Sequence, residues 1–229
     1  MSVGLLHPGA MGSAVGAAVT GEVIWASEGR SDATRARAAG FRDAGTLEAL
    51  VAEADVILSI CPPHAALDVA RACAGFGGVY VDANAISPAH AREIGALHPR
   101  FVDGGIIGGP DAPALYLSGG EAAQVAGLFH GIETRVVPDA SALKMAYAAW
   151  SKGTAALLLA IRDVAAHFGV EDEWRRAAPE LEDRLGRAEA SAREKGWRWI
   201  GELEEIADTF AAAGQPEGFH RAAAEVYRR

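Results

Sequence analysis

The sequence predicts an α/β fold, in which a doubly wound and mainly parallel sheet is followed by an all-α C-terminal domain. Over residues 1–138, short apolar runs alternate with helical stretches of about ten residues, an order that is typical of βαβ units. The runs are apolar throughout, as strands buried on both faces of a parallel sheet require. After Pro138 no strand pattern is found, so residues 139–229 form the expected helical domain.

The first residues carry the pattern of a dinucleotide-binding turn. Residues 3–6 predict a buried strand, Pro8 and Gly9 a turn, and residues 10–19 a helix of small residues. The backbone N–H groups of such a turn and the positive end of the helix dipole attract a pyrophosphate, as in a Rossmann domain. The first glycine of the G-x-G-x-x-G pattern is His7 here, so a tight turn without a ligand is the alternative. The residues expected to bind the cofactor are His7, Pro8, Gly9, Ala10, Met11 and Gly12.

The remaining elements follow from apolar runs and helix-capping residues. Further strands are predicted at 22–26, 41–42, 55–60, 79–82, 101–103, 115–117 and 134–137, and a glycine-rich turn follows residue 103. Helices are predicted at 31–39, 46–54, 65–74, 88–97 and 121–129, with Ser31, Thr46 and Ser87 as N-caps. In the helical domain the predicted segments are 141–168, 171–195 with breaks at Pro179 and Gly186, 197–213 closed by Gly214, and 216–229.

Composition excludes several classes of function. The 229 residues are half hydrophobic, which allows a sizeable core, and the net charge of −9 argues against partners such as nucleic acid or a membrane surface. Cys61 and Cys73 have no metal-ligand spacing, and two thiols in a chain of this length favour a reducing compartment. No leader or membrane-spanning run is recognised, so a cytoplasmic protein without a metal site is expected.

The turn after the second strand bears on the choice of cofactor. Ligands of a doubly wound sheet lie beyond the carboxyl ends of its strands, where Ser27, Glu28, Arg30 and Ser31 stand. A carboxylate at this place binds the ribose 2′-hydroxyl of NAD, whereas an arginine accommodates the 2′-phosphate of NADP. Because Arg30 and the two serines offer several donors to one phosphate, NADP is favoured over NAD. A solvated polar turn, with Ser31 only capping the helix, is the alternative.

The turns after later strands supply more candidates. Cys61, Pro62 and Pro63 form a rigid turn that can flank the cofactor, although Pro63 is also a common first helical residue. Asn84 follows the next strand, has no capping duty, and is expected to face the nicotinamide or the substrate. Ile107, Gly108 and Gly109 end a glycine-rich segment that is expected to present backbone N–H groups to a substrate, with a flexible loop as the alternative.

Lys144 is the candidate proton donor. It stands near the start of an apolar helix, and burial among Leu143, Met145 and Ala148 would lower its pKa and ease proton transfer. The alternative is a lysine whose apolar stem is buried and whose ammonium reaches the surface. Tyr147 and Trp150 follow within two helical turns, as a further catalytic and a substrate-contacting candidate.

Several segments together resemble the β-hydroxyacid dehydrogenase and 6-phosphogluconate dehydrogenase superfamily. They are residues 7–12, 103–109, 117–120 and 142–145. Residues 144–150 and 197–202 resemble the branch whose C-terminal half is a phosphogluconate-dehydrogenase-like domain of unknown function. The resemblance implies an NAD(P)-dependent oxidoreductase acting on a small molecule, with its catalytic lysine at Lys144 and a homodimer built on the helical domain. Residues 141–168 are also too apolar around their circumference for a solvent-exposed helix, which favours the same dimer.

Three positions depart from that family, and the first is His7, which replaces the first glycine of the fingerprint. Ile107 stands where the hydroxyacid enzymes have a substrate-binding serine, and Ala148 where they have an asparagine one turn after the lysine. Both groups that would position a substrate carboxylate are therefore missing. Three functions stay open: hydride transfer between NADP(H) and a small carbonyl or hydroxy compound, reduction of an imine, and NADP binding without turnover by a sensor or scaffold.

Overall fold

The computed structural model describes residues 1–228, and the chain divides into two compact units. The sheet unit runs from Met1 to Lys144, and the helical unit begins at Met145. The sequence-based boundary at 138/139 falls just before helix α7 (Ala140–Ala148), whose first turns belong to the sheet unit. Arg229, the last residue of the predicted final helix, lies outside the described residues.

One eight-stranded sheet forms the centre of the sheet unit. Its strands are β1 (Ser2–Leu5), β2 (Glu22–Trp25), β3 (Arg42–Asp43), β4 (Val56–Ser59), β5 (Val79–Asp82), β6 (Phe101–Ile107), β7 (Ala114–Ser118) and β8 (Glu133–Val136). Their order is β3-β2-β1-β4-β5-β6-β7-β8, and every pair is parallel except β6 with β7. The strand order reverses at β1, between β2 and β4, which is the switch point where such sheets bind ligands. The predicted mainly parallel sheet is confirmed.

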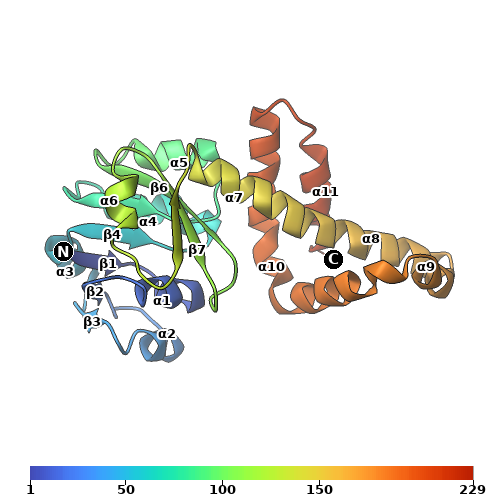
Figure 1. Ribbon diagram of the computed structural model, residues 1–229, viewed down its shortest axis with the longest axis horizontal. Coiled ribbons are helices and arrows are strands. Elements are labelled where there is room, and N and C mark those ends of the chain that lie inside the picture. Colours follow the sequence, from blue (N-terminus) through green and yellow to red (C-terminus); the bar gives the residue numbers. More distant parts are fainter. Residues whose placement is uncertain (229) are drawn as a thin grey trace. The chain divides into compact units, whose positions relative to one another are not determined.

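Helices cover the sheet, as Figure 1 shows. They are α1 (Ala10–Gly16), α2 (Asp32–Arg37), α3 (Leu47–Glu53), α4 (Ala66–Ala72) after a 3₁₀ turn (Pro63–Ala65), α5 (Pro88–Gly95) and α6 (Ala122–Ala126). The side chains of Ser31, Thr46 and Ser87 accept backbone hydrogen bonds as the predicted N-caps. Side chains of β4 point alternately into two core clusters. Val56 and Leu58 belong to one cluster, and Ile57 belongs to the other. Burial on both faces explains the unbroken apolar runs.

Strand β6 is longer than the sequence predicted. The glycine-rich turn expected after residue 103 is instead the second half of this strand, which continues to Ile107. Antiparallel pairing with β7 holds it, with Gly104 opposite Leu117 and Gly105 opposite Tyr116. The strand is defined by its pairing with the next strand along the chain, which the glycine pattern alone does not reveal.

The helical unit contains no strand among its described residues. After α7, a π-helical turn (Ala149–Gly153) leads into α8 (Thr154–His167), followed by α9 (Glu171–Ala177), a 3₁₀ turn (Pro179–Leu181), α10 (Glu182–Ala212) and α11 (Gly218–Val226). The break predicted at Gly186 is wrong, because α10 passes through it and joins the predicted segments 171–195 and 197–213. Glycine costs a helix about 1 kcal/mol relative to alanine, and burial of Leu185 and Ala188 beside it offsets that cost. Gly214, with φ +68°, closes α10 as expected.

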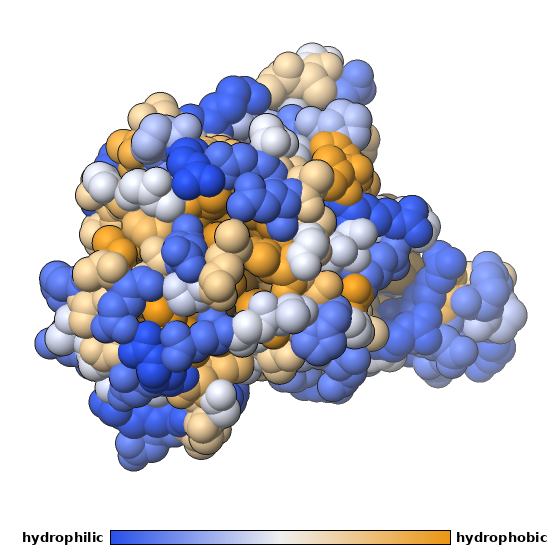
Figure 2. Space-filling view, turned by 60° about the vertical axis from the view of Figure 1, so that its left-hand side comes forward, coloured by the Kyte–Doolittle hydropathy of each residue, from blue (hydrophilic) through white to orange (hydrophobic). Residues whose placement is uncertain are grey.

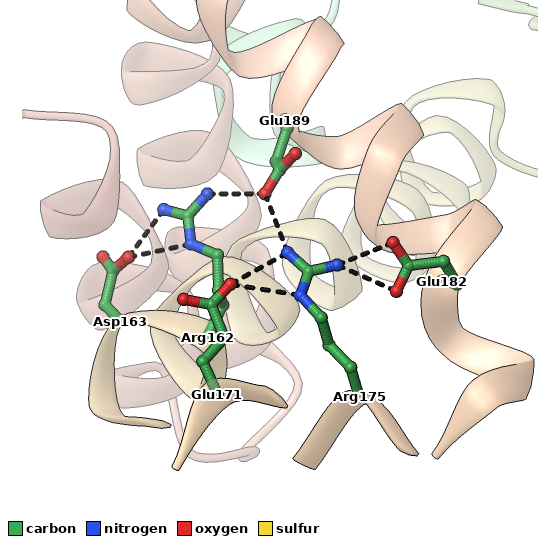
Figure 3. A network of polar contacts seen from close by, with 6 residues as sticks. All are labelled: Arg162, Asp163, Glu171, Arg175, Glu182 and Glu189. Carbon is green, nitrogen blue, oxygen red and sulfur yellow. Dashed lines mark hydrogen bonds and ion pairs between the residues drawn. The ribbon is translucent and has the colours of Figure 1, made fainter. Parts of the chain in front are cut away.

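A network of ion pairs joins α8, α9 and α10 (Figure 3). Arg162 contacts Asp163 and Glu189, at 2.6 and 2.8 Å. Arg175 contacts Glu171 and Glu182, and it approaches Glu189 at 3.9 Å. Glu189 therefore bridges the two arginines, and the charged stretch that the sequence shows over 171–195 cross-links three helices.

On the face shown in Figure 2, hydrophobic residues form separate patches between hydrophilic ones. In residues 1–228, no helix combines the length and the apolar character that crossing a membrane requires.

Candidate functional site

The glycine turn has the geometry of a phosphate-binding turn. Gly9 is the N-cap of α1 and has an extended conformation with φ −70°. A Cβ built on Gly9 meets nothing within 4 Å, whereas one on Gly12 lies far inside contact distance of the His7 carbonyl oxygen. Ser13 Oγ donates to the carbonyl oxygen of Pro8 at 3.0 Å and fixes the turn. The backbone at Gly9 is thus open to a ligand, and Gly12 keeps the helix close to the turn.

A cavity of about 120 Å³ lies beside this turn. Its lining comprises Leu6, His7, Ala26, Glu28, Arg30, Leu47, Val69 and Ala72. Arg30 Nη2 donates to the carbonyl oxygen of Leu6 at 3.1 Å. Within the described chain, Arg30 Nε and His7 Nδ1 are buried without a hydrogen-bond partner. Buried polar atoms are normally hydrogen-bonded, and a ligand can supply the partners that these two atoms lack. The residues present therefore fit the polar part of a dinucleotide, and apolar side chains of the lining can contact its base.

His7 meets this cavity as a neutral side chain. Burial, with a smaller contribution from the charge of Arg30, lowers the pKa of His7 to about 4. An uncharged imidazole adds no positive charge for a phosphate, so Arg30 supplies the cationic group of the pocket. Glu28 and Arg30, which in the sequence favour different cofactors, both line this cavity.

The predicted serines are partly engaged by the protein itself. Ser31 caps α2, with its Oγ accepting the N–H of Thr34 at 3.4 Å. The backbone N–H of Ser27 donates to Asp43, and its carbonyl oxygen accepts from Arg35 Nη2 at 2.7 Å. Arg35 was not predicted, although an arginine one turn into the helix after a phosphate-binding loop is a usable signal. Its guanidinium holds the loop's backbone and adds positive charge beside it.

The turns after β4 and β5 are tied together by Asn84. Its Nδ2 donates to Asp82 Oδ2 at 2.8 Å and to Ser59 Oγ at 3.2 Å, and its Oδ1 accepts the backbone N–H of Cys61. Asn84 is 2% exposed. Asn84 caps no helix, as expected, but both polar atoms of its side chain hydrogen-bond within the protein, a positioning role that the sequence did not predict. Asn84 positions the turn of Cys61, Pro62 and Pro63, and direct contact of Asn84 with a nicotinamide stays a prediction.

Asp82, which the sequence did not single out, is buried at the centre of this network. Burial raises the pKa of Asp82 to about 7, although hydrogen bonds from the Asn84 backbone and side chain oppose that rise. Burial, and then the charge of Asp82, raise the pKa of the Cys61 thiol to about 12. Cys61 is therefore a neutral part of the turn. A polar residue that ends a buried strand was the available sequence signal for Asp82.

Lys144 is placed by a second buried carboxylate, Asp103 of β6. Asp103 accepts hydrogen bonds from the backbone N–H and Oγ of Ser141 and from Ser118 Oγ, and Ser118 Oγ accepts the N–H of Ala140. These bonds fix the first turn of α7 on strands β6 and β7. Burial raises the pKa of Asp103 above the usual range. The sequence revealed none of this clamp, since its partners lie up to 38 residues apart.

The ammonium of Lys144 lies at the carboxyl end of β6. Its Nζ donates to the carbonyl oxygen of Ile106 at 2.8 Å, and the side chain is partly buried. A Cβ on Gly105 would meet Ala140 and Lys144 at 2.9 and 3.0 Å, so this glycine permits the close approach of α7. The chain turns at Gly108, where φ is +99°, directly after Ile107. Lys144 and the end of the glycine-rich segment are thus brought together, as the sequence-based interpretation requires.

The other candidates belong to the helical unit. Tyr147 and Trp150 are exposed, at 43% and 60%. The side chain of Lys152 is only 13% exposed, pairs with Glu202 at 2.7 Å, and lies 5.8 Å from the centre of the Trp199 ring.

Two family models match separate parts of the chain. Residues 22–108 match the NADP-binding domain of saccharopine dehydrogenase, and residues 165–229 match DUF1932, a domain of unknown function. An uncharacterised 28.5 kDa protein of Methanothermus fervidus is 32% identical over 163 residues. That alignment covers 66% of this chain, and the chain spans 65% of the length of the relative.

Several solved structures match the fold of this chain over almost its whole length. A conserved protein of unknown function with similarity to 3-hydroxyacid dehydrogenases is 25% identical, with a TM-score of 0.73 over 100% of this chain and 97% of that one. The 3-hydroxyisobutyrate dehydrogenase of Mycobacterium tuberculosis is 18% identical, with a TM-score of 0.69 over 99% and 92%. An imine reductase of Myxococcus stipitatus is 20% identical, with a TM-score of 0.57 over 99% and 92%. At these identities the two enzymes share the fold with this chain.

Proposed function

We propose that the chain is a member of the NAD(P)-binding 6-phosphogluconate dehydrogenase-like superfamily and an NADP(H)-dependent oxidoreductase for a small carbonyl compound or its alcohol. The observation that carries this proposal is the fixed position of Lys144. Its ammonium is held at the carboxyl end of β6 in the same unit as the dinucleotide pocket. Carboxyl ends of parallel strands meet at the edge of the sheet where ligands bind.

The cofactor contacts are assigned to residues of the sheet unit. The turn of residues 7–12 would face the pyrophosphate with backbone N–H groups, and Gly9 leaves room for it. Arg30 would bind the 2′-phosphate of NADP, because its Nε is buried without a partner in the described chain and guanidinium suits phosphate oxygens. Glu28 would lie beside the ribose. The preference for NADP(H) over NAD(H) rests on Arg30 and on Arg35, whose Nε donates to the backbone carbonyl oxygen of Arg30.

Lys144 would act as the general acid or base. The nicotinamide supplies the hydride when it is bound, and the protein supplies orientation and a proton. The Asp103 clamp fixes the helix that carries the lysine, and the carbonyl oxygen of Ile106 orients its Nζ. An ammonium held in this way can donate a proton to the oxygen of a carbonyl during reduction, or accept one from an alcohol in the reverse direction.

A C=N substrate is the second candidate. It is favoured by Ile107 and Ala148, which replace the serine and the asparagine expected to hold a substrate carboxylate. An imine needs a proton at nitrogen as hydride arrives, and Lys144 can supply it in the same position. The carbonyl and imine readings therefore share one proton donor and differ in the reacting bond.

We also propose a homodimer built on the helical unit. Leu157, Ile161, Val164 and Phe168 follow one another at spacings of four and three residues, and they are 60%, 37%, 58% and 71% exposed. This spacing is the seam of paired helices. Light scattering should give twice the chain mass of 23.8 kDa, and Val164→Glu should give the monomer mass.

The free thiols Cys61 and Cys73 support a reducing, cytoplasmic setting.

Turnover decides between these functions. Oxidation of NADPH is measured against 3-oxo acids, semialdehydes and cyclic imines, with wild type beside Lys144→Met. Turnover of a carbonyl class supports the first reading, and turnover limited to imines supports the second. Tight NADPH binding without turnover on any of the three classes would contradict the enzyme proposal and leave a sensor or scaffold.

A further inference from the structure

The helical unit contains a cavity whose lining belongs to that unit alone. It has a volume of about 510 Å³ and lies between the π-helical turn with α8 on one side and α10 on the other. Ligand pockets for small organic molecules have volumes of about 300–1,000 Å³. The lining side chains that matter are the indoles of Trp150 and Trp199, the guanidinium groups of Arg184 and Arg187, and Leu158 and Ser191. We propose that this cavity binds a small anion with a flat apolar body, such as an aromatic carboxylate.

Charge is the first argument for an anion. Arg184 and Arg187 are three residues apart on α10, and no carboxylate lines the cavity. In residues 1–228 neither guanidinium has an ion-pair partner, although the chain carries a net charge of −9. Arg162, Arg175, Arg176, Arg221 and Arg228 of the helical unit do have such partners. Arg193 and Arg198 have none among the described residues either, but they lie outside the cavity lining, so only Arg184 and Arg187 bring unpaired charge to it. Two guanidinium groups left without carboxylates at one cavity are suited to an oxyanion.

The indoles are the argument for a flat body. Trp199 is held in place by an edge-to-face contact with Tyr227, with ring centres 5.3 Å apart, and by Lys152 over its ring. Because Lys152 is paired with Glu202, its charge is satisfied within the protein. Trp150 is 60% exposed, with the guanidinium of Arg184 6.0 Å from its ring centre. Aromatic faces beside cationic groups favour a planar anion over an aliphatic one.

A second copy of the chain would fill this cavity less favourably than a small anion does. The exposed seam consists of Leu157, Ile161 and Val164 of α8 and of Phe168 directly after it, all apolar, and Leu157 also lines the cavity. The only acid of α8 is Asp163, which is already paired with Arg162. Covering Arg184 and Arg187 with such a helix would bury two charges without partners, which is costly. A small anion removes that cost because it brings its own negative charge.

Naphthoate and its uncharged analogue naphthylmethanol are suitable probes, since they share the ring system and differ in charge. Binding to the full chain is measured by calorimetry, with quenching of tryptophan fluorescence as a second readout. Naphthoate should bind once per chain and at least tenfold more tightly than naphthylmethanol. Arg187→Gln should weaken naphthoate binding at least tenfold, which corresponds to about 1.4 kcal/mol. The affinity for naphthylmethanol should stay unchanged.

Arg193→Gln is the matched control, because Arg193 lies on the same helix outside the cavity lining. Circular dichroism confirms that each variant remains folded. Equal affinity for the two probes would overturn the proposal, and so would equal losses in Arg187→Gln and Arg193→Gln. Naphthoate that binds only while it splits a dimer, as seen by light scattering, would assign the cavity to a second copy and also contradict the proposal.

Discussion

Gly9 and Gly12 stand three residues apart in one turn, yet replacing them with alanine should have opposite consequences. The Cβ of Gly12→Ala would overlap the carbonyl oxygen of His7, a backbone atom that cannot rotate away. Overpacking of this kind costs about 1–3 kcal/mol. For a chain of this size the melting temperature should fall by about 2–12 °C. The helix must also move away from the turn, so NADPH binding should be lost with it.

Gly9→Ala places its methyl group in open space, with φ −70° that alanine adopts readily. Stability should therefore stay unchanged or rise by about 0.4–1 kcal/mol, because the unfolded chain loses freedom. The same methyl group would stand where the pyrophosphate approaches the backbone. The affinity for NADPH should fall more than tenfold, about 1.4 kcal/mol.

Calorimetry for NADPH and thermal unfolding of both variants, with wild type, test this pair. The reasoning predicts one stable variant that does not bind and one destabilised variant. Gly9→Ala that binds NADPH like wild type would refute the assignment of the turn to the pyrophosphate. Wild-type stability in Gly12→Ala would refute the packing argument.

Further predictions concern other parts of the molecule. Burial raises the pKa of Asp82 to about 7 in the folded chain, above its ordinary value of 3.8, so ionisation of Asp82 removes stability as pH rises through that interval. Urea unfolding at several pH values should show that Asp82→Asn gains stability relative to wild type between about pH 4 and 7, and a constant difference would contradict the burial argument. Lys144→Met should lower kcat on the identified substrate by about two to four orders of magnitude while NADPH affinity is retained, and full activity would move the proton donor elsewhere. Glu189→Gln should cost about 1 kcal/mol in urea unfolding, because Glu189 bridges two arginines, whereas the exposed control Glu173→Gln should cost less than about 0.5 kcal/mol.

The sequence predicted most of the sheet unit because its signals are local. Apolar runs marked β4 and β5, and capping residues such as Ser31 and Ser87 marked the starts of helices. The end of β6 was misread, since only its pairing with β7 distinguishes a glycine-rich strand from a turn. The continuity of α10 through Gly186 was missed for a related reason, because burial of its neighbours outweighs a weak local preference.

Part of the candidate site was likewise predictable. Glu28, Arg30 and Lys144 stand after strand ends or at a helix start, positions that the chain order gives directly. The carboxylates that hold the site together were not found, because Asp103 acts through Ser118 and Ser141, far along the chain. A hydrogen-bonded clamp depends on which strands are neighbours, and only the folded sheet determines that.

The central claim is that the sheet unit binds NADP(H), and a titration of the full chain with NADPH and with NADH tests it most directly. Calorimetry should show tighter binding of NADPH, and Arg30→Ala should remove the difference by weakening NADPH alone, by about 1.5–3 kcal/mol. Equal losses for the two cofactors, a wild-type preference for NADH, or no binding of either would contradict the account.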